Sequence, residues 1–265
     1  MNHLLRSSAP ISDAGWSLLD DEARARLEPA LGARKVVDFE GPRGWQHSAS
    51  GLGRTRAIEA ASLEGVQARA RVVLPLIELR AELELDRAEL FDADRGAPDP
   101  DLTPLDDAAR RIAVAENRLV FHGAGDADGG IVERTPYQVA ALGEPGDYPG
   151  AVATAVGLLL GSGVGGPYAL ALGEEPYRLA IASSDRGGYP LVSHLREILG
   201  GPIVRAVGLH GAVVLSRRGG DFLLDCGQDL SIGYASHDEA VVNLYIEESL
   251  SFRVATPEAA VALSS

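Results

Sequence analysis

The sequence predicts an α+β protein, because helical and strand patterns occupy separate stretches of the chain. Apolar residues recur at helical spacing near the start and in the middle, and they alternate with polar residues between these stretches and again near the end. A hydrophobic content of 46% with 23% charged residues is ordinary for a globular protein, so a chain of 265 residues can bury a large core.

The first predicted element is a helix that begins after Ser12, which is a good N-cap residue. Leu19, Ala23 and Leu27 recur at helical spacing along it, and Pro29 should end or kink it. A turn-rich passage follows over residues 32–47.

Two alternating segments come next. Residues 67–86 alternate between apolar and polar side chains, which predicts a strand with one exposed face. Residues 54–60 form an earlier alternating segment that is basic. Together the two could form a projecting two-stranded arm, which needs a partner surface because an isolated pair of strands is marginally stable in water.

Acidic residues, three prolines and Gly96 predict an exposed loop over residues 89–106. Thr103 should then cap a long helix with Pro104 at its first position and Gly123 as its terminator. The apolar stripe of this helix should make it the spine of the main domain. The stripe consists of Leu105, Ala108, Ile112, Leu119 and Val120.

A loop-rich passage over residues 125–147 leads into a second lobe of mixed helix and strand, residues 131–217. Residues 150–173 carry no charge over a length that could span a bilayer, but internal glycines and Pro167 favour a buried helix, 152–160, followed by a strand, 168–172. The end of the chain returns to alternating strands, from Val242 through Val254.

Charge and cysteine content exclude several classes of function. The formal charge of −14 disfavours a general nucleic-acid binder, because phosphate backbones must be neutralised by clustered Lys and Arg. The single cysteine, Cys226, excludes an intrachain disulfide and a cysteine-based zinc site, and we expect it to be a small buried side chain. The first ten residues lack the apolar core of a signal peptide, so a reducing cytoplasm fits best.

Motifs that carry catalysis are weak in this sequence. The G-x-G-x-x-G match at residues 161–166 follows the predicted helix instead of opening it, which indicates a turn and not a dinucleotide site. Ser236, His237 and Asp238 are adjacent, so their side chains should diverge instead of forming a triad. The histidines and the acidic residues 92–107 lack the ligand spacing of metal sites. We therefore expect no catalytic residue, no cofactor and no metal.

Several segments carry a resemblance to a known family. They are Ala-Pro-Ile at 9–11, Gly-Pro-Arg-Gly-Trp at 41–45, Pro-Leu-Ile-Glu-Leu-Arg at 75–80, Gly-Pro-Tyr at 166–168 and the run at 218–234 that ends in Leu-Ser-Ile-Gly-Tyr. Over nearly its whole length the chain resembles the family 1 encapsulins, which are shell proteins of bacterial nanocompartments. This family also includes the linocin-type bacteriocins.

The resemblance implies the tailed-bacteriophage major capsid protein fold with a peripheral domain, an axial domain and an extended loop. The peripheral domain would comprise residues 1–47, 79–130 and 218–265, the extended loop residues 48–78, and the axial domain residues 131–217.

It also implies a non-enzymatic protein that assembles with itself into an icosahedral shell of roughly 60 copies in the cytoplasm. Such a shell encloses a cargo enzyme, a dye-decolourising peroxidase or a ferritin-like iron oxidase, through the C-terminal targeting peptide of the cargo, and binds neither nucleic acid nor membrane. A prophage-derived capsid protein and a bacteriocin or hydrolase remain as alternatives.

Two groups of site residues follow from the resemblance. The cargo peptide would dock where apolar side chains accept its aliphatic anchors and charged ones orient its polar groups, and Pro29 interrupts the helix expected there. The alternative is that these residues are ordinary core and an Arg34–Asp38 ion pair. The docking positions are Leu31, Arg34, Val37, Asp38, Ile232 and Tyr234. A pore-lining loop would comprise Ser183, Ser184, Asp185, Arg186, Gly187, Gly188 and Tyr189.

Overall fold

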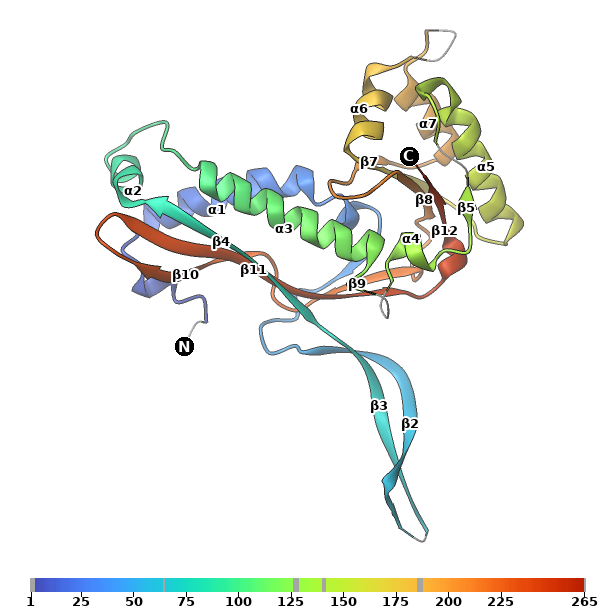
Figure 1. Cartoon of the computed structure of the whole chain (residues 1–265), viewed down its shortest axis with the longest axis horizontal. Helices are drawn as coiled ribbons and strands as arrows, with labels where there is room; N and C mark the ends of the chain where they lie inside the picture. Colours follow the sequence, from blue (N-terminus) through green and yellow to red (C-terminus); the bar gives the residue numbers. More distant parts are fainter. Residues whose placement is uncertain (1–2, 64, 126–128, 140–141, 185–187, 265) are drawn as a thin grey trace.

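The computed structural model describes residues 3–63, 65–125, 129–139, 142–184 and 188–264, which form an elongated lobe, a compact lobe and a projecting arm (Figure 1). Each lobe is built on a five-stranded sheet, and the arm is a separate two-stranded sheet. Helices pack on both larger sheets, so the predicted α+β class is confirmed.

The sheet of the elongated lobe has the strand order β1-β9-β11-β10, with β4 also paired to β11. Strands β4 and β10 pair with the same part of β11 and therefore lie on opposite edges of it. The strands are β1 Asp38–Glu40, β4 Ile77–Asp86, β9 Phe222–Cys226, β10 Ser231–His237 and β11 Val241–Val254.

Helices α1 (Asp13–Ala30) and α3 (Thr103–His122) cover one face of this sheet and share a core with it (Figure 1). Ser12 is the N-cap of α1, as predicted, and its hydroxyl accepts a hydrogen bond from the N–H of Gly15. Pro29 lies in the last turn, and α1 ends one residue later.

The prediction that Thr103 caps α3 is wrong by one residue. Leu102 occupies the N-cap position and Thr103 is the first helical residue. The carboxylate of Asp101 accepts a hydrogen bond from the N–H of Thr103, so the capping oxygen comes from two residues earlier. Gly123 ends the helix with a φ of 79°, as predicted.

The exposed loop predicted over residues 89–106 is also partly wrong, because its first part is the short helix α2 (Arg87–Asp94). Asp86 is its N-cap and accepts a hydrogen bond from the N–H of Ala88. Leu90 is the one buried residue of α2, so the helix shows almost no apolar periodicity in the sequence.

The arm consists of β2 (Ala49–Leu63) and β3 (Val66–Pro75), antiparallel and projecting away from both lobes (Figure 1). The predicted two-stranded arm is present, but the prediction of one continuous strand over residues 67–86 is wrong. The chain leaves the arm at Pro75, which has no N–H for a ladder, and Leu76 donates its N–H to the carbonyl of Ser48 before β4 begins.

A cluster of side chains around Asp225 fixes the root of the arm to β9. The Asp225 carboxylate accepts hydrogen bonds from Arg43 Nε at 2.5 Å and from the Ser50 hydroxyl, and it contacts His47 Nε2 at 3.1 Å. Although burial opposes it, these hydrogen bonds hold the pKa of Asp225 below its usual value.

The compact lobe has the strand order β5-β12-β8-β6-β7, with α5, α6 and α7 packed around it (Figure 1). Every position of β6 and β8 is buried, and the predicted helix and strand of the charge-free stretch correspond to α5 and β6. The final strand, β12, lies in this sheet and not beside β11.

No helix of the described residues has both the length and the hydropathy to cross a membrane. The strands are β5 Gln138–Val139, β6 Tyr168–Leu172, β7 Ile203–Arg205, β8 Ala212–Ser216 and β12 Ala260–Leu263; the helices are α4 Ile131–Arg134, α5 Tyr148–Gly161, α6 Glu174–Ala182 and α7 Leu191–Leu199.

Candidate docking groove

A groove of about 490 Å³ runs between α1 and the start of β10. Aliphatic side chains line it along its length, and charged side chains from α1 and from the turn between β9 and β10 stand beside them. Such a surface can bind an extended segment through apolar anchors and polar contacts together. The lining residues are Asp20, Ala23, Arg24, Leu27, Glu28, Leu31, Arg34, Asp229, Leu230, Ser231, Ile232 and Ile246.

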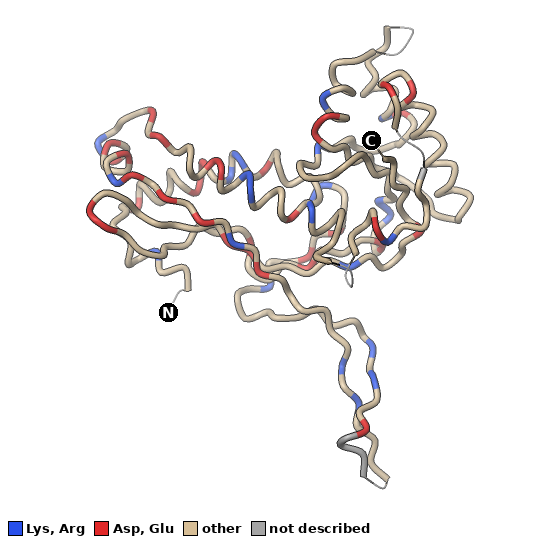
Figure 2. Tube along the Cα trace, viewed as in Figure 1, with Lys and Arg blue, Asp and Glu red and all other residues tan. Residues whose placement is uncertain are grey.

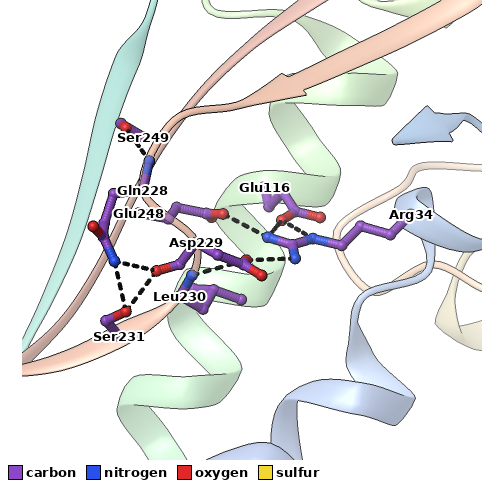
Figure 3. Close-up of polar contacts among 8 residues, drawn as sticks. All are labelled: Arg34, Glu116, Gln228, Asp229, Leu230, Ser231, Glu248 and Ser249. Atoms are coloured by element: carbon purple, nitrogen blue, oxygen red, sulfur yellow. Dashed lines mark hydrogen bonds and ion pairs between the residues drawn. The ribbon is translucent and has the colours of Figure 1, made fainter. Parts of the chain in front are cut away.

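Arg34, in the short 3-10 helix η2 (Ala33–Lys35), joins three segments at one end of the groove (Figure 3). Its guanidinium pairs with Glu116 of α3 at 2.6 Å, with Glu248 of β11 at 2.8 Å and with Asp229 of the β9–β10 turn at 2.8 Å. The side chains of Glu116 and Glu248 are fully buried, and that of Arg34 is 16% exposed. Arg34 therefore holds these three segments together through contacts within the chain.

The buried carboxyls exceed the positive charge that faces them. Among the described residues Arg34 is the only cation paired with Glu116 and Glu248. Burial raises the pKa of both carboxyls, and the charge of Glu116 raises that of Glu248 further.

The β9–β10 turn beside Arg34 is fixed by its own hydrogen bonds (Figure 3). The side chain of Gln228 donates to the Ser231 hydroxyl at 2.8 Å, and Ser231 donates to the carbonyl of Asp229 at 2.7 Å. The Asp229 carboxylate also accepts from the N–H of Leu230 at 2.9 Å. The wall of the groove is therefore organised in the free chain.

Three of the six predicted docking residues, Leu31, Arg34 and Ile232, line this groove. Val37 and Asp38 lie in a separate small depression near Phe222, where Asp38 accepts a hydrogen bond from the N–H of Gly220. The Arg34–Asp38 ion pair of the alternative interpretation is absent among the described residues, because Arg34 faces the three other carboxylates.

The sixth residue, Tyr234, follows on β10 and contacts His237 Nδ1 through its hydroxyl at 2.6 Å. Sequence reasoning missed Leu27, Asp229 and the buried partners of Arg34. The helical spacing of Leu27 and Leu31 was a usable signal for the first of these.

The described residues of the predicted pore loop, 183–184 and 188–189, lie between α6 and α7 at the far end of the compact lobe (Figure 1). Ser184 pairs with Pro190 across the base of the loop, and the Tyr189 hydroxyl donates to Glu197 at 2.9 Å. Asp185, Arg186 and Gly187 lie outside the described residues.

The catalytic motifs have structural explanations. Residues 161–166 form the turn between α5 and β6. Ser236 accepts a hydrogen bond from Asn243 and Asp238 accepts from the N–H groups of a tight turn, so neither joins His237 in a triad. Burial raises the pKa of the Cys226 thiol to about 12, as suits a buried hydrophobic side chain. The described residues contain no group of three or more side chains suited to hold a metal.

Solved structures establish the class of fold. The virus-like particle from Pyrococcus furiosus aligns with a TM-score of 0.68 at 17% identity, covering 94% of this chain and 99% of that one. The capsid of Myoviridae phage XM1 aligns with a TM-score of 0.52 at 13% identity, covering 88% and 90%. The chain therefore has the tailed-bacteriophage major capsid fold, as predicted.

Sequence relatives identify the family within that class. A family model described as "Encapsulating protein for peroxidase" matches residues 1–251. The type 1 encapsulin shell protein of Rhodospirillum rubrum is 47% identical, covering 99% of this chain and 96% of that protein. The one from Mycobacterium tuberculosis is 38% identical over the full length of both. This chain belongs to the family of encapsulin shell proteins.

Proposed function

We propose that this chain assembles into a closed shell of roughly 60 copies that encloses a cargo enzyme in the cytoplasm. Family membership over the whole length is the observation that carries the proposal. The projecting arm supports it as well, since a two-stranded ribbon without a core of its own gains stability from a neighbouring surface.

The groove beside α1 is the proposed dock for the C-terminal tail of the cargo. Leu27, Leu31 and Ile232 offer aliphatic contacts, and Glu28 and Asp229 offer carboxylates to the polar groups of the tail. Arg34 acts in this proposal as a positioning residue that holds Asp229 in the wall of the groove. The words "for peroxidase" in the family description favour a peroxidase as cargo over a ferritin-like iron oxidase.

In the same proposal the loop between α6 and α7 lines an opening through which small solutes enter. Ser183, Ser184, Gly188 and Tyr189 are its described members, and their hydroxyls and glycine can form a narrow polar rim. The compact lobe would then be the axial domain, the elongated lobe the peripheral domain and β2–β3 the extended loop.

A steric block tests the docking groove. Glu28 is exposed on α1 and lines the groove, so Glu28→Trp places a bulky ring over it. Ala25, one turn earlier, is exposed but does not line the groove, so Ala25→Trp is the matched control. The probe is green fluorescent protein fused to the C-terminal tail of a dye-decolourising peroxidase and co-expressed with the chain.

We expect wild-type and Ala25→Trp shells to retain the fluorescent probe. Glu28→Trp shells should contain at least about tenfold less probe per shell, because docked tails depend on few anchoring contacts. Equal loading of all three shells would contradict docking in this groove. Loss of the shells themselves in both variants would instead point to a folding defect, which circular dichroism would report.

A further inference from the structure

Charged residues of both signs are spread along the elongated lobe (Figure 2). Glu116 and Glu248 differ from most of them because their side chains are fully buried, next to Arg34 at one end of the docking groove. With Asp229 they place three carboxyls around a single guanidinium (Figure 3). Since excess charge is costly in a buried site, the number of protons on this cluster determines how it is arranged.

The geometry of the cluster favours a proton on Glu248. Arg34 presents two nitrogens to Glu116 Oε2, each at 2.6 Å, which stabilises an ionised Glu116. A single nitrogen of Arg34 donates to Glu248 Oε2 at 2.8 Å. The second oxygen of each carboxyl, Oε1, is buried without a hydrogen-bond partner in the part of the chain that the structure describes. Such an oxygen costs less free energy on a neutral carboxyl than on a carboxylate, so the carboxyl with the weaker contact to Arg34 holds the proton.

The pKa of Glu248 agrees with this geometry. Burial, and after it the charge of Glu116, raise the pKa well above its ordinary value, against the opposing effect of Arg34. Glu248 is therefore neutral at a pH at which an exposed glutamate is already ionised, and it ionises as the pH rises further.

The groups that face Glu248 come from four segments. They are Arg34 of η2, Glu116 of α3, Asp229 of the β9–β10 turn and Cys226 of β9. Arginine stays protonated, and burial raises the pKa of Cys226 to about 12, which keeps the thiol uncharged. Glu116 has the closer contact with Arg34 and loses its proton first, so Glu248 is the last carboxyl of the cluster to ionise.

Asp229 is the one member of the cluster that can leave it. Its side chain is 41% exposed, whereas Glu116 and Glu248 are enclosed on α3 and β11. Asp229 Oδ1 accepts from Arg34 at 2.8 Å and from the N–H of Leu230 at 2.9 Å. When Glu248 ionises, the three negative charges repel one another, and movement of Asp229 into water relieves the repulsion because solvent hydrates its carboxylate.

Departure of Asp229 would change the wall of the groove. Asp229, Leu230 and Ser231 line it, and the contact of Asp229 with Arg34 ties this turn to η2. Without that contact a docked segment must order the wall as it binds, and affinity falls by the free energy of that ordering.

We propose that Glu248 is a proton switch of the docking groove. While its carboxyl is neutral, Arg34 holds Asp229 in the wall and the cargo tail docks; when it ionises, Asp229 leaves the cluster and the tail binds more weakly. The inference rests on the proposed dock and adds its regulation, because docking then weakens as the surroundings become alkaline.

The lining of the groove offers no competing switch near neutral pH. No histidine is among the lining residues that the structure describes. A pH dependence of docking in this range therefore points to a group behind the wall and not to one in it.

Hydrogen–deuterium exchange of purified full-length shells at pH 6 and pH 9 tests the switch, with each rate divided by that of an unfolded chain at the same pH. The Leu230 amide reports the wall, because its acceptor is Asp229. Docking is reported by the added protection of residues 23–31 in shells loaded with green fluorescent protein fused to the C-terminal tail of a dye-decolourising peroxidase, relative to empty shells.

Two matched substitutions separate Glu248 from its surroundings. Glu248→Gln keeps an oxygen for Arg34 but cannot ionise. The control is Glu247→Gln, because the Glu247 carboxyl contacts His3 at 3.0 Å instead of Arg34 and burial raises its pKa as well. Circular dichroism monitors folding, and Glu248→Met, equally unable to ionise, replaces Glu248→Gln if that variant does not fold.

In the wild type we expect corrected exchange at Leu230 to be at least about tenfold faster at pH 9 than at pH 6, and loaded shells to lose most of the added protection, because the wall opens locally. Glu248→Gln should change less than about twofold between the two pH values at either site. Glu247→Gln should behave as the wild type does.

Three results would overturn the switch while the dock stands. They are wild-type protection that is equal at the two pH values, a Glu248→Gln shell that responds to pH as the wild type does, and a Glu247→Gln shell that has lost the response. Loaded wild-type shells without added protection of residues 23–31 at either pH would instead contradict docking in this groove, and the switch with it.

Discussion

Removal of Arg34 should destabilise the chain strongly, and more so at alkaline than at acid pH. Arg34→Met keeps much of the aliphatic length but leaves Glu116 and Glu248, both fully buried, without a cation. Loss of one partner of a buried ion pair costs about 3–5 kcal/mol, which is roughly a 150- to 5,000-fold change in the unfolding equilibrium. We expect a loss in this range at pH 8.

The loss should shrink as the pH falls. Burial already raises the pKa of Glu116 and Glu248, and removal of Arg34 raises each further, so the variant takes up protons that relieve the uncompensated charge. At pH 5 we therefore expect at most about half of the alkaline loss.

Urea unfolding followed by tryptophan fluorescence, at one fixed subunit concentration because assembly contributes to stability, measures the difference. The control is the same substitution in a Glu116→Gln, Glu248→Gln background, where little charge remains to be stranded. An Arg34→Met protein within about 1 kcal/mol of the wild type at pH 8 would refute the reasoning. A loss that is unchanged in the doubly neutral background would do the same.

Further predictions concern the same cluster, the core, the arm root and the thiol. Because the folded-state pKa of Glu248 lies above its ordinary value, its contribution to stability falls as pH rises from about 4.3 through the raised pKa. In the wild type this lowers the free energy of unfolding, measured in urea, by up to about 1.4 kcal/mol per pH unit, and Glu248→Gln should flatten that dependence. An unchanged pH dependence would contradict the raised pKa. Leu19→Ala, at a fully buried position, should cost about 2–5 kcal/mol in the same assay, and a cost under about 1 kcal/mol would mean that α1 is not packed as described. Asp225→Asn should speed hydrogen exchange of the Arg43 amide about tenfold near neutral pH. The depressed pKa of Asp225 means that its carboxylate stabilises the arm root above about pH 3.9, and this stabilisation is lost only as pH falls through the folded-state pKa. An unchanged exchange rate would count against the cluster around Asp225. Iodoacetamide at pH 8 should leave Cys226 unmodified until urea unfolds the chain, and rapid labelling of the native protein would disprove its burial.

Local features of this fold could be predicted from the sequence because neighbouring residues determine them. The Ser12 cap, the end of α3 at Gly123 and the projecting arm each depend on a few consecutive residues. Helix α2 was missed because its only buried residue is Leu90, which leaves no apolar period to detect.

The groove could be predicted only in part, because its geometry depends on distant segments. Arg34 meets side chains that are 82, 195 and 214 positions away in the sequence, so a local pattern could only suggest the nearby Asp38 as its partner. In the same way, Pro75 could signal only a break in the strand, and no local signal tells that Ile77 begins a strand of another sheet or that β12 returns to the compact lobe. Such choices are made by tertiary packing.

Sedimentation velocity of the purified full-length chain, expressed without cargo and imaged in parallel by negative-stain microscopy, tests the central claim most directly. A closed shell predicts one dominant, fast-sedimenting species of hollow round particles of uniform size, free of nucleic acid. A stable monomer or dimer at every concentration, or particles filled with nucleic acid, would contradict it.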